Sequence, residues 1–245
     1  MKPKVAFFDF TSCEGCQLEV VNFEQEVLQL LNLLDIVNFR ELMTERSDDY
    51  DIAIIDGAIS TDADVARIKE IRERASILIT IGACSSLGGV NCLKNAYPME
   101  EVLSVVYGDA AGYYNTIPAR PVSAVVPVDY ALPQCPVNKA EFLEVVKALL
   151  LGKKPEIPNY PVCAECKMAE NACVFDLGRT CLGPVTRAGC NALCVTWGRH
   201  CWGCRGLVDD PNVDAATDVL KEHGLTAEDI VNKFRIYTAW TGGSE

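Results

Sequence analysis

The chain has 245 residues, of which 49% are hydrophobic and 23% charged, so it is long enough and apolar enough to bury a sizeable core. Its 22 basic and 34 acidic residues give a formal net charge of −12, which disfavours nucleic acid as a partner because the chain would repel a phosphate backbone. The chain begins without a signal-peptide pattern, and no apolar run approaches the roughly 18 residues that span a bilayer. We therefore expect a cytoplasmic protein without a membrane span.

Thirteen cysteines are an unusually large number for a chain of this length. In a reducing compartment, cysteines at such density are metal ligands more often than disulfide partners. A secreted disulfide framework would also need a signal peptide and a smaller, loop-rich chain, and the odd count leaves one thiol over. The composition therefore favours metal binding over a disulfide scaffold.

Strand-like and helix-like segments alternate from residue 4 to about residue 150. In chain order, the sequence predicts a strand at 5–10, a helix at 16–31, strands at 35–42 and 50–59, a helix at 62–75, a strand running into a glycine-containing loop at 76–86, and a helix at 138–152. The strand cores at 52–55 and 77–81 are apolar without alternation, which indicates a parallel sheet covered by helices on both faces. The first half is therefore predicted to be an α/β domain of flavodoxin-like type.

A domain boundary is predicted near residue 155. The stretch "KKPEIPNYPVC", residues 153–163, contains three prolines and is typical of an extended linker. Beyond it, eight cysteines fall between residues 163 and 204 with little periodicity, so a bound group must organise the segment. We expect a first domain at 1–155 and a cysteine-rich domain at 156–245, whose tail at 213–240 forms one or two amphipathic helices that pack back on the body.

The first domain contains a predicted group of four cysteines. Cys13 and Cys16 follow the first strand, Cys84 follows a later strand within "IGACSSLGG", and Cys135 lies in "LPQCPVNKAE" before the last helix. The carboxyl ends of parallel strands meet at one edge of a sheet, so these thiolates are expected to converge on one site. The glycines near Cys84 would let the backbone approach a bound group, and Pro136 follows Cys135 as proline follows the last ligand in bacterial ferredoxins.

A dithiol oxidoreductase is the main alternative for the first cysteine pair. Its redox motif also has the order strand, Cys-x-x-Cys, helix. This alternative leaves Cys84, Cys135 and the eight later cysteines without a role. Free cysteines do pack as small apolar residues, but glycine- or proline-flanked loops are less suited to that role.

The eight later cysteines divide evenly into two groups of four. The simplest partition by spacing separates Cys163, Cys166, Cys173 and Cys181 from Cys190, Cys194, Cys201 and Cys204. Four thiolates would also hold a structural zinc ion, and spacing alone does not exclude it. Two arguments favour iron-sulfur clusters: twelve thiolates would form three sites of one chemistry, and the irregular spacings differ from the paired Cys-x-x-Cys knuckles of zinc ribbons.

Several motifs carry a resemblance to a known family. They are "TSCEGC", "IGACSSLGGV", "CPVNK", "PVCAEC", "CLGPVTRAGC" and "CWGCRG". Over residues 4 to about 210, the chain resembles the small, electron-transferring subunit of cytoplasmic nickel-iron hydrogenases. It is most similar to the group with sulfhydrogenase delta and methyl viologen-reducing hydrogenase small subunits.

The resemblance implies three 4Fe-4S clusters and no catalytic residue in this chain. It assigns Cys13, Cys16, Cys84 and Cys135 to a proximal cluster, Cys163, Cys166, Cys173 and Cys181 to a distal cluster, and Cys190, Cys194, Cys201 and Cys204 to a medial cluster. It further implies that the proximal cluster sits against a large subunit whose nickel-iron site splits H2. Electrons would leave to a further subunit of flavin/NAD(P), ferredoxin-like or heterodisulfide reductase type.

The sequence departs from the periplasmic uptake relatives at two ligand positions. Cys163 stands where they use histidine, and Cys194 stands where they have a proline and a 3Fe-4S centre. Both changes add thiolate charge, which is expected to lower the cluster potentials.

Two other functions remain open at this point. The cluster-bearing core subunit of NADH:quinone reductase shares the plan of the first domain, but it typically lacks the eight-cysteine extension and has adjacent cysteines where this chain has Cys13 and Cys16. A zinc-stabilised assembly or interaction subunit is the second alternative. A dinucleotide site is disfavoured because "GACSSLGG" lacks the G-x-G-x-x-G spacing, so any NAD(P) or flavin would belong to other subunits.

Further polar residues are expected to have no ligand role. Cys92 is interpreted as a partly buried non-ligand, His200 as a packing or surface residue, and His223 as solvent-facing. Glu14 is interpreted as an acidic residue at a helix N-terminus, with a proton relay as the alternative. Trp197 and Trp202 lie within the last cysteine motif and are expected to shield it from water.

Overall fold

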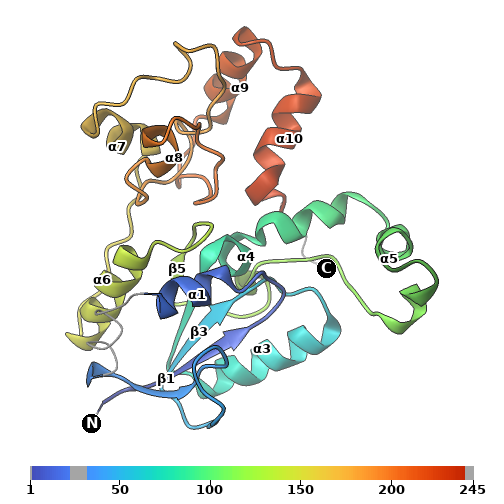
Figure 1. The fold of residues 1–245 in the computed structure, drawn as a ribbon, viewed down its shortest axis with the longest axis vertical. Coiled ribbons are helices and arrows are strands. Elements are labelled where there is room, and N and C mark those ends of the chain that lie inside the picture. The colour runs from blue at the N-terminus through green and yellow to red at the C-terminus, as the bar shows by residue number, and fades with distance from the viewer. Residues whose placement is uncertain (1, 23–31, 241–245) are drawn as a thin grey trace. The chain divides into compact units, whose positions relative to one another are not determined.

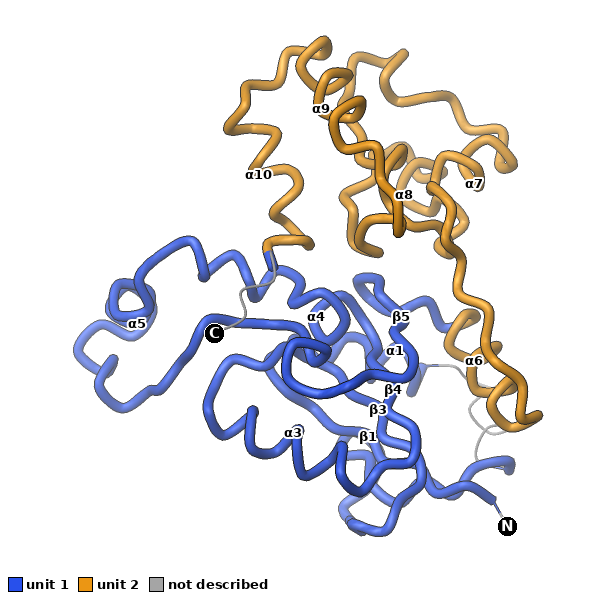
Figure 2. The backbone as a smooth tube through the Cα atoms, turned by 180° about the vertical axis from the view of Figure 1, so that it is seen from behind, with its two compact units in different colours: residues 1–139, 240–245 blue, residues 140–239 orange. Residues whose placement is uncertain are grey.

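The computed structural model describes residues 2–22 and 32–240 of the chain. The chain divides into two compact units, one formed by Met1–Lys139 with Trp240–Glu245 and the other by Ala140–Ala239 (Figure 2). The predicted helix at 16–31 lies partly outside the described residues. Its described part is helix α1.

The first unit is built on a parallel sheet (Figure 1). Its strands are β1 (Lys4–Asp9), β2 (Asp35–Asn38), β3 (Ile52–Asp56), β4 (Ile77–Ile81) and β5 (Tyr130–Leu132). They pair in the order β2-β1-β3-β4-β5, and each described pairing is parallel. This is the strand order of flavodoxin-like folds, so the predicted α/β fold class is confirmed.

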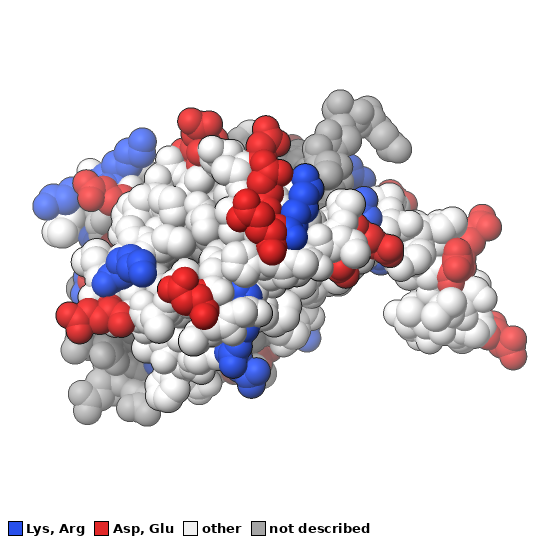
Figure 3. All heavy atoms as spheres, turned by 90° about the horizontal axis from the view of Figure 1, so that it is seen from above, with Lys and Arg blue, Asp and Glu red and all other residues white. Residues whose placement is uncertain are grey.

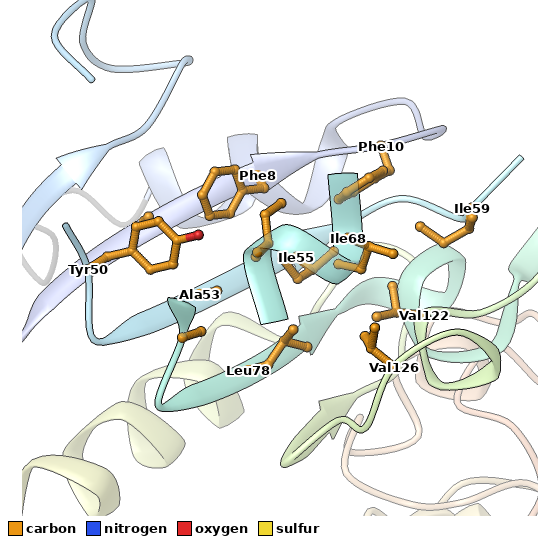
Figure 4. Packing of buried hydrophobic residues seen from close by; sticks show 13 residues of the cluster. Phe8, Phe10, Tyr50, Ala53, Ile55, Ile59, Ile68, Leu78, Val122 and Val126 are labelled. Atoms are coloured by element: carbon orange, nitrogen blue, oxygen red, sulfur yellow. The ribbon is translucent and has the colours of Figure 1, made fainter. Parts of the chain in front are cut away.

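The apolar central strands form the core of this sheet. Ile54 of β3 pairs with Ile79 of β4, and both side chains are buried. On one face, Ile55 and Leu78 pack with Ile68 of the neighbouring helix α3, and all three are fully buried (Figure 4). Strands buried on both faces have no reason to alternate polar and apolar residues, which explains the uninterrupted runs in the sequence.

The first unit contains several helices besides its strands. They are α1 (Gly15–Val21), α3 (Asp62–Arg74), α4 (Gly82–Leu87) and α5 (Met99–Tyr107), with 3-10 turns η1 (Gly89–Ala96), η2 (Gly108–Tyr113) and η3 (Val122–Ala124). Helix α3 begins as predicted because Thr61 and Asp64 form a reciprocal capping box, with N–O distances of 3.1 and 3.0 Å.

Two sequence predictions in this unit are corrected. The strand expected at 35–42 ends at Asn38, because the backbone turns at Phe39, whose carbonyl accepts hydrogen bonds from the N–H groups of Leu42 and Met43. The glycine-containing loop expected around Cys84 is the short helix α4, which starts directly after β4.

The second unit contains five helices among its described elements. They are α6 (Lys139–Leu150), α7 (Val162–Met168), α8 (Leu193–Thr196), α9 (Val213–Glu222) and α10 (Ala227–Thr238). The predicted tail is a pair of helices, and its Leu220 and Ile230 pack with Leu182 of the cysteine-rich segment. The tail therefore packs on the cysteine-rich segment of its own unit.

The compact units differ in extent from the predicted domains at 1–155 and 156–245. Helix α6 belongs almost wholly to the second unit, because Glu141 on this helix forms a two-bond ion pair with the buried Arg205, at 2.8 and 2.6 Å. Residues 153–159 have no regular secondary structure, as the linker prediction requires. The proline-rich stretch therefore connects two elements of one compact unit.

Charged side chains are spread over the surface. Figure 3 shows acidic and basic residues interspersed on one face, with uncharged surface between them. None of the helices within residues 2–22 and 32–240 is long and apolar enough to cross a membrane.

Truncation of the sheet core tests the packing. We expect Leu78→Ala to lower the free energy of unfolding of the first unit by about 2–5 kcal/mol, because the fully buried side chain leaves a cavity. Val105→Ala is the control, since Val105 is 80% exposed on α5 and its truncation should change stability by about 0.5 kcal/mol or less. Denaturant unfolding followed by circular dichroism measures both. Equal losses in the two variants would contradict this core.

Candidate metal centres

The four cysteines predicted for the first site lie at the carboxyl edge of the sheet. Cys13 lies in the turn after β1, and Cys16 lies in the first turn of α1. Cys84 lies in α4, directly after β4, and Cys135 follows β5. Each is thus positioned by the end of a strand in the parallel sheet, where ligands of such folds bind.

These four thiols are close enough to affect one another's ionisation. The pKa of Cys84 is raised to about 12, first by burial and then by the nearby Asp56, Cys135 and Cys13. The pKa of Cys16 is also raised, first by burial and then by Asp56, Cys84 and Cys135. The structure therefore brings the four predicted cysteines together. Their role as ligands stays a prediction.

The first cysteine group has a buried side and an exposed side. Cys16 is buried and Cys84 is half-buried, whereas Cys13 and Cys135 are exposed. A group held by these thiols would therefore lie near the surface on the side of Cys13 and Cys135.

A glycine makes room for one of these thiols. Gly82, the first residue of α4, has a φ of +82°, and a Cβ atom there would overlap the sulfur of Cys16. The next residue, Ala83, donates its N–H to the carbonyl of Gln134 at 2.7 Å. This bond joins the start of α4 to the segment that carries Cys135.

A buried carboxyl group beside this site was not anticipated from the sequence. Asp56 ends the central strand β3 and is only 1% exposed, and its Oδ2 has no hydrogen-bond partner among the described residues. Its pKa is raised to about 7, chiefly by burial, and the nearby backbone N–H groups of Gly57 and Gln17 oppose this shift. An acidic residue at the end of an otherwise apolar central strand is the signal that could have identified it.

Glu14 lies at the N-terminus of α1, as expected, and its side chain interacts with neighbouring charged residues. It precedes α1 with a left-handed backbone (φ +59°), and its side chain does not cap the helix. Its carboxyl group lies 3.7 Å from the guanidinium of Arg40, and its pKa is raised chiefly by a hydrogen bond with Glu41. The interpretation of Glu14 as an acidic residue at a helix N-terminus is confirmed by its position.

The second cysteine group surrounds a cavity of about 90 Å³. The cavity is lined by all four predicted cysteines, Cys163, Cys166, Cys173 and Cys181, and by apolar side chains that include Val174, Phe175 and Val195. The pKa of Cys163 is raised to about 11, first by burial and then by the three other thiols. The sulfur of Cys181 accepts hydrogen bonds from the N–H groups of Gly183 and Cys201, each at 3.3 Å.

The size of this cavity bears on what it can hold. A single water molecule needs only about 10–15 Å³, so the space has room for a group of several atoms. Within residues 2–22 and 32–240, no three His, Cys, Asp or Glu side chains are placed to bind one metal ion. The sulfur-lined, apolar space fits an iron-sulfur cluster, which is held by thiolates and accepts N–H hydrogen bonds on sulfur.

The third cysteine group is joined to the second through shared contacts. Cys201 is buried, and its thiol pKa is raised by burial and by both Cys181 and Cys204. Cys190 lies beside Glu165 and Arg205, and its thiol lies 3.9 Å from a carboxylate oxygen of Glu165. The assignment of Cys190, Cys194, Cys201 and Cys204 to one site stays a prediction.

The residues that were predicted to have no ligand role pack against other parts of the chain. Cys92 is fully rather than partly buried, and its S–H donates to the carbonyl of Ala119 at 3.0 Å. The ring of His200 packs on Trp202 with centroids 4.1 Å apart, as its packing interpretation requires. His223 is exposed, as predicted, and also packs edge-on against Phe175.

The two tryptophans differ from the prediction. Trp197 is 78% exposed, since it lies at the C-terminal end of the short helix α8 with its ring toward solvent, so the expected shielding role is wrong for it in this chain. Trp202 is 42% exposed and packs between His200 and the ammonium group of Lys233, which lies 5.5 Å from its ring centroid.

Comparison with known proteins places this geometry in a family. The family described as "NADH ubiquinone oxidoreductase, 20 Kd subunit" matches residues 13–149. Sulfhydrogenase 2 subunit delta of Pyrococcus furiosus is 37% identical over 240 residues, which cover 97% of this chain and 100% of that protein. A vhu subunit of the F420-non-reducing hydrogenase of Methanocaldococcus jannaschii is 31% identical, covering 97% of this chain and 94% of that protein.

Chains of solved hydrogenase structures have the same fold as this chain. A chain of an NAD+-reducing [NiFe]-hydrogenase superimposes with a TM-score of 0.59 at 25% identity, covering 64% of this chain and 96% of that chain. A chain of the Ni-Fe-Se hydrogenase from Desulfomicrobium baculatum shares the fold, with a TM-score of 0.56 at 16% identity over 89% of this chain and 98% of that chain.

The quinone reductase family matches residues 13–149 and ends before the eight-cysteine segment, whereas the two hydrogenase relatives each cover 97% of the chain. The chain therefore belongs to the family of nickel-iron hydrogenase small subunits that includes these two relatives, which are subunits of hydrogenases and thus of oxidoreductases.

Proposed function

We propose that the chain relays electrons between the nickel-iron site of a large subunit and a redox partner subunit, through three 4Fe-4S clusters, in the cytoplasm. The observation that carries this proposal is the cavity of about 90 Å³ surrounded by Cys163, Cys166, Cys173 and Cys181. Four thiols around an apolar space larger than one ion are what a cluster requires.

The proposed ligand sets follow the cysteine groups. The proximal cluster would be held by Cys13, Cys16, Cys84 and Cys135, the distal cluster by Cys163, Cys166, Cys173 and Cys181, and the medial cluster by Cys190, Cys194, Cys201 and Cys204. Bound clusters would supply one-electron transfer, and hydrogen is split on the large subunit. The chain itself supplies the cysteine sulfurs and the N–H groups that donate hydrogen bonds to them, as Gly183 and Cys201 do for Cys181.

The exposure of the cysteines in the first group indicates which surface the large subunit would contact. Cys13 and Cys135 are exposed whereas Cys16 is buried, so a proximal cluster would approach the surface beside Cys13 and Cys135. We propose this surface as the contact with the large subunit. The redox partner would be a further subunit of flavin/NAD(P), ferredoxin-like or heterodisulfide reductase type.

Metal analysis of the purified protein tests the proposal directly. We expect a brown protein with about twelve irons and a matching amount of acid-labile sulfide per chain, because three groups of four cysteines each hold four irons. Elemental analysis and visible absorption measure this. A colourless protein with stoichiometric zinc would contradict electron transfer and favour a zinc-stabilised assembly subunit.

A substitution beside the first cysteine group tests the proximal site. Gly82→Ala places a methyl group in the position of the Cys16 sulfur, so we expect the iron content to fall by about a third. Gly112→Ala is the matched control, because a Cβ atom there meets nothing within 4 Å and its backbone is not left-handed. Iron and sulfide per chain are measured for both variants. Full iron in Gly82→Ala would remove Cys16 from the proposed ligands.

The partition of the last eight cysteines is tested at Cys194. This residue lies in the first turn of α8, where proline is tolerated. We expect Cys194→Pro to convert the medial centre to a 3Fe-4S form with a higher potential, because one thiolate is lost. Electron paramagnetic resonance with redox titration detects the change, with Cys92→Ala as a control that retains the wild-type spectrum. An unchanged spectrum in Cys194→Pro would show that the partition is wrong.

A further inference from the structure

The chain around Cys190 has an unfavourable backbone conformation. Gly189 has a φ of +113°, and the two non-glycine residues Asn191 and Ala192 have φ values of +52° and +50°. Consecutive left-handed residues of this kind persist only where surrounding contacts hold them, and they concentrate at functional sites. We call residues 188–192 the Cys190 loop.

A buried carboxylate holds this loop from one side. Glu165 is 8% exposed, and its two oxygens accept hydrogen bonds from the backbone N–H groups of Gly189 at 2.7 Å and of Ala192 at 3.3 Å. The same carboxylate lies 3.9 Å from the sulfur of Cys190. It therefore fixes the backbone on both sides of this cysteine.

A buried guanidinium holds the loop from its other end. The Nε of Arg205 donates to the carbonyl of Ala188 at 2.6 Å, and the rest of the guanidinium is neutralised by Glu141. A Cβ atom at Gly189 would overlap this guanidinium. Arg205 thus fixes the entry to the Cys190 loop, whereas Glu165 fixes its centre.

The position of Glu165 in the sequence makes this contact informative. It lies on α7 between Cys163 and Cys166, two cysteines that line the cavity of the second group. Its side chain nevertheless bonds the loop that carries Cys190, the first cysteine of the third group. One short helix therefore presents two thiols to one site and orients the backbone of another.

A carboxylate suits this position better than a neutral side chain. The N–H groups of Gly189 and Ala192 donate to different oxygens of Glu165, whereas the amide of glutamine offers one acceptor oxygen and one donor nitrogen. Burying a carboxylate beside several cysteines is otherwise unfavourable, because its negative charge is removed from water and would lie next to the negative charges of thiolate ligands. Its presence is explained if the geometry of the Cys190 loop depends on it.

We propose that Glu165 is a positioning residue that couples the two cysteine groups of the second unit, by holding Cys190 in the orientation that its metal centre requires. This inference rests on the proposed function, in which both groups hold 4Fe-4S clusters. The carboxylate also adds one negative charge beside the centre bound by Cys190, which lowers the potential of that centre.

Two substitutions of Glu165 test the coupling. Glu165→Ala removes both acceptors, so we expect the metal content to fall by about a third. Alkylation resolved by mass spectrometry should then find Cys190, Cys194, Cys201 and Cys204 reactive while Cys163, Cys166, Cys173 and Cys181 remain protected as in the wild type. Glu165→Gln keeps one acceptor and loses the charge, so it should retain its clusters and raise the potential of one of them.

The control is Glu222→Ala with Glu222→Gln, since Glu222 is an exposed glutamate at the end of α9 in the same unit. Three results would each overturn the coupling. In Glu165→Ala, all eight cysteines could stay protected as in the wild type, or all eight could become reactive together. In Glu165→Gln, the cluster potentials could equal those of the wild type. The metal measurement also separates the two proposals. A wild-type chain that holds zinc refutes the clusters, and the loss of a third of that zinc in Glu165→Ala would still support the coupling.

Discussion

The parallel pairing of the strands is the constraint on which the first cysteine group depends. Because β1, β4 and β5 all run in the same direction, the segments that follow them leave the sheet at one edge. Cys13, Cys84 and Cys135 meet there although they are far apart in the sequence. Asp56 lies buried at the same edge, because it ends β3.

The second unit depends on buried charges in place of a sheet. Arg205 and Glu141 form an ion pair with almost no exposure, and Glu165 bonds the Cys190 loop. Buried charges are tolerated only where their hydrogen bonds are satisfied, so each of them fixes the backbone that it contacts. A segment with little regular structure thereby acquires a defined conformation around its thiols, with only a small apolar core of its own.

The sequence predicted the elements whose patterns arise locally. The apolar runs at 52–55 and 77–81 identified β3 and β4, and the charged stretch at 62–75 identified α3. It did not predict that Cys84 lies in a helix, because the six residues Gly82–Leu87 are mostly small and carry no helical period. It placed the boundary near residue 155, because proline content does not reveal that Glu141 on α6 pairs with Arg205.

The sequence by itself determined the fold class, the twelve candidate cysteines and the family resemblance, because strand patterns and cysteine spacings are properties of local sequence. Only the tertiary structure decided which thiols are buried and which are exposed, and that Asp56 and Glu165 lie buried beside them. The physical reason is that burial and hydrogen bonding depend on segments distant in the chain. A glutamate between two cysteines looks like a solvent-exposed residue until the Cys190 loop folds against it.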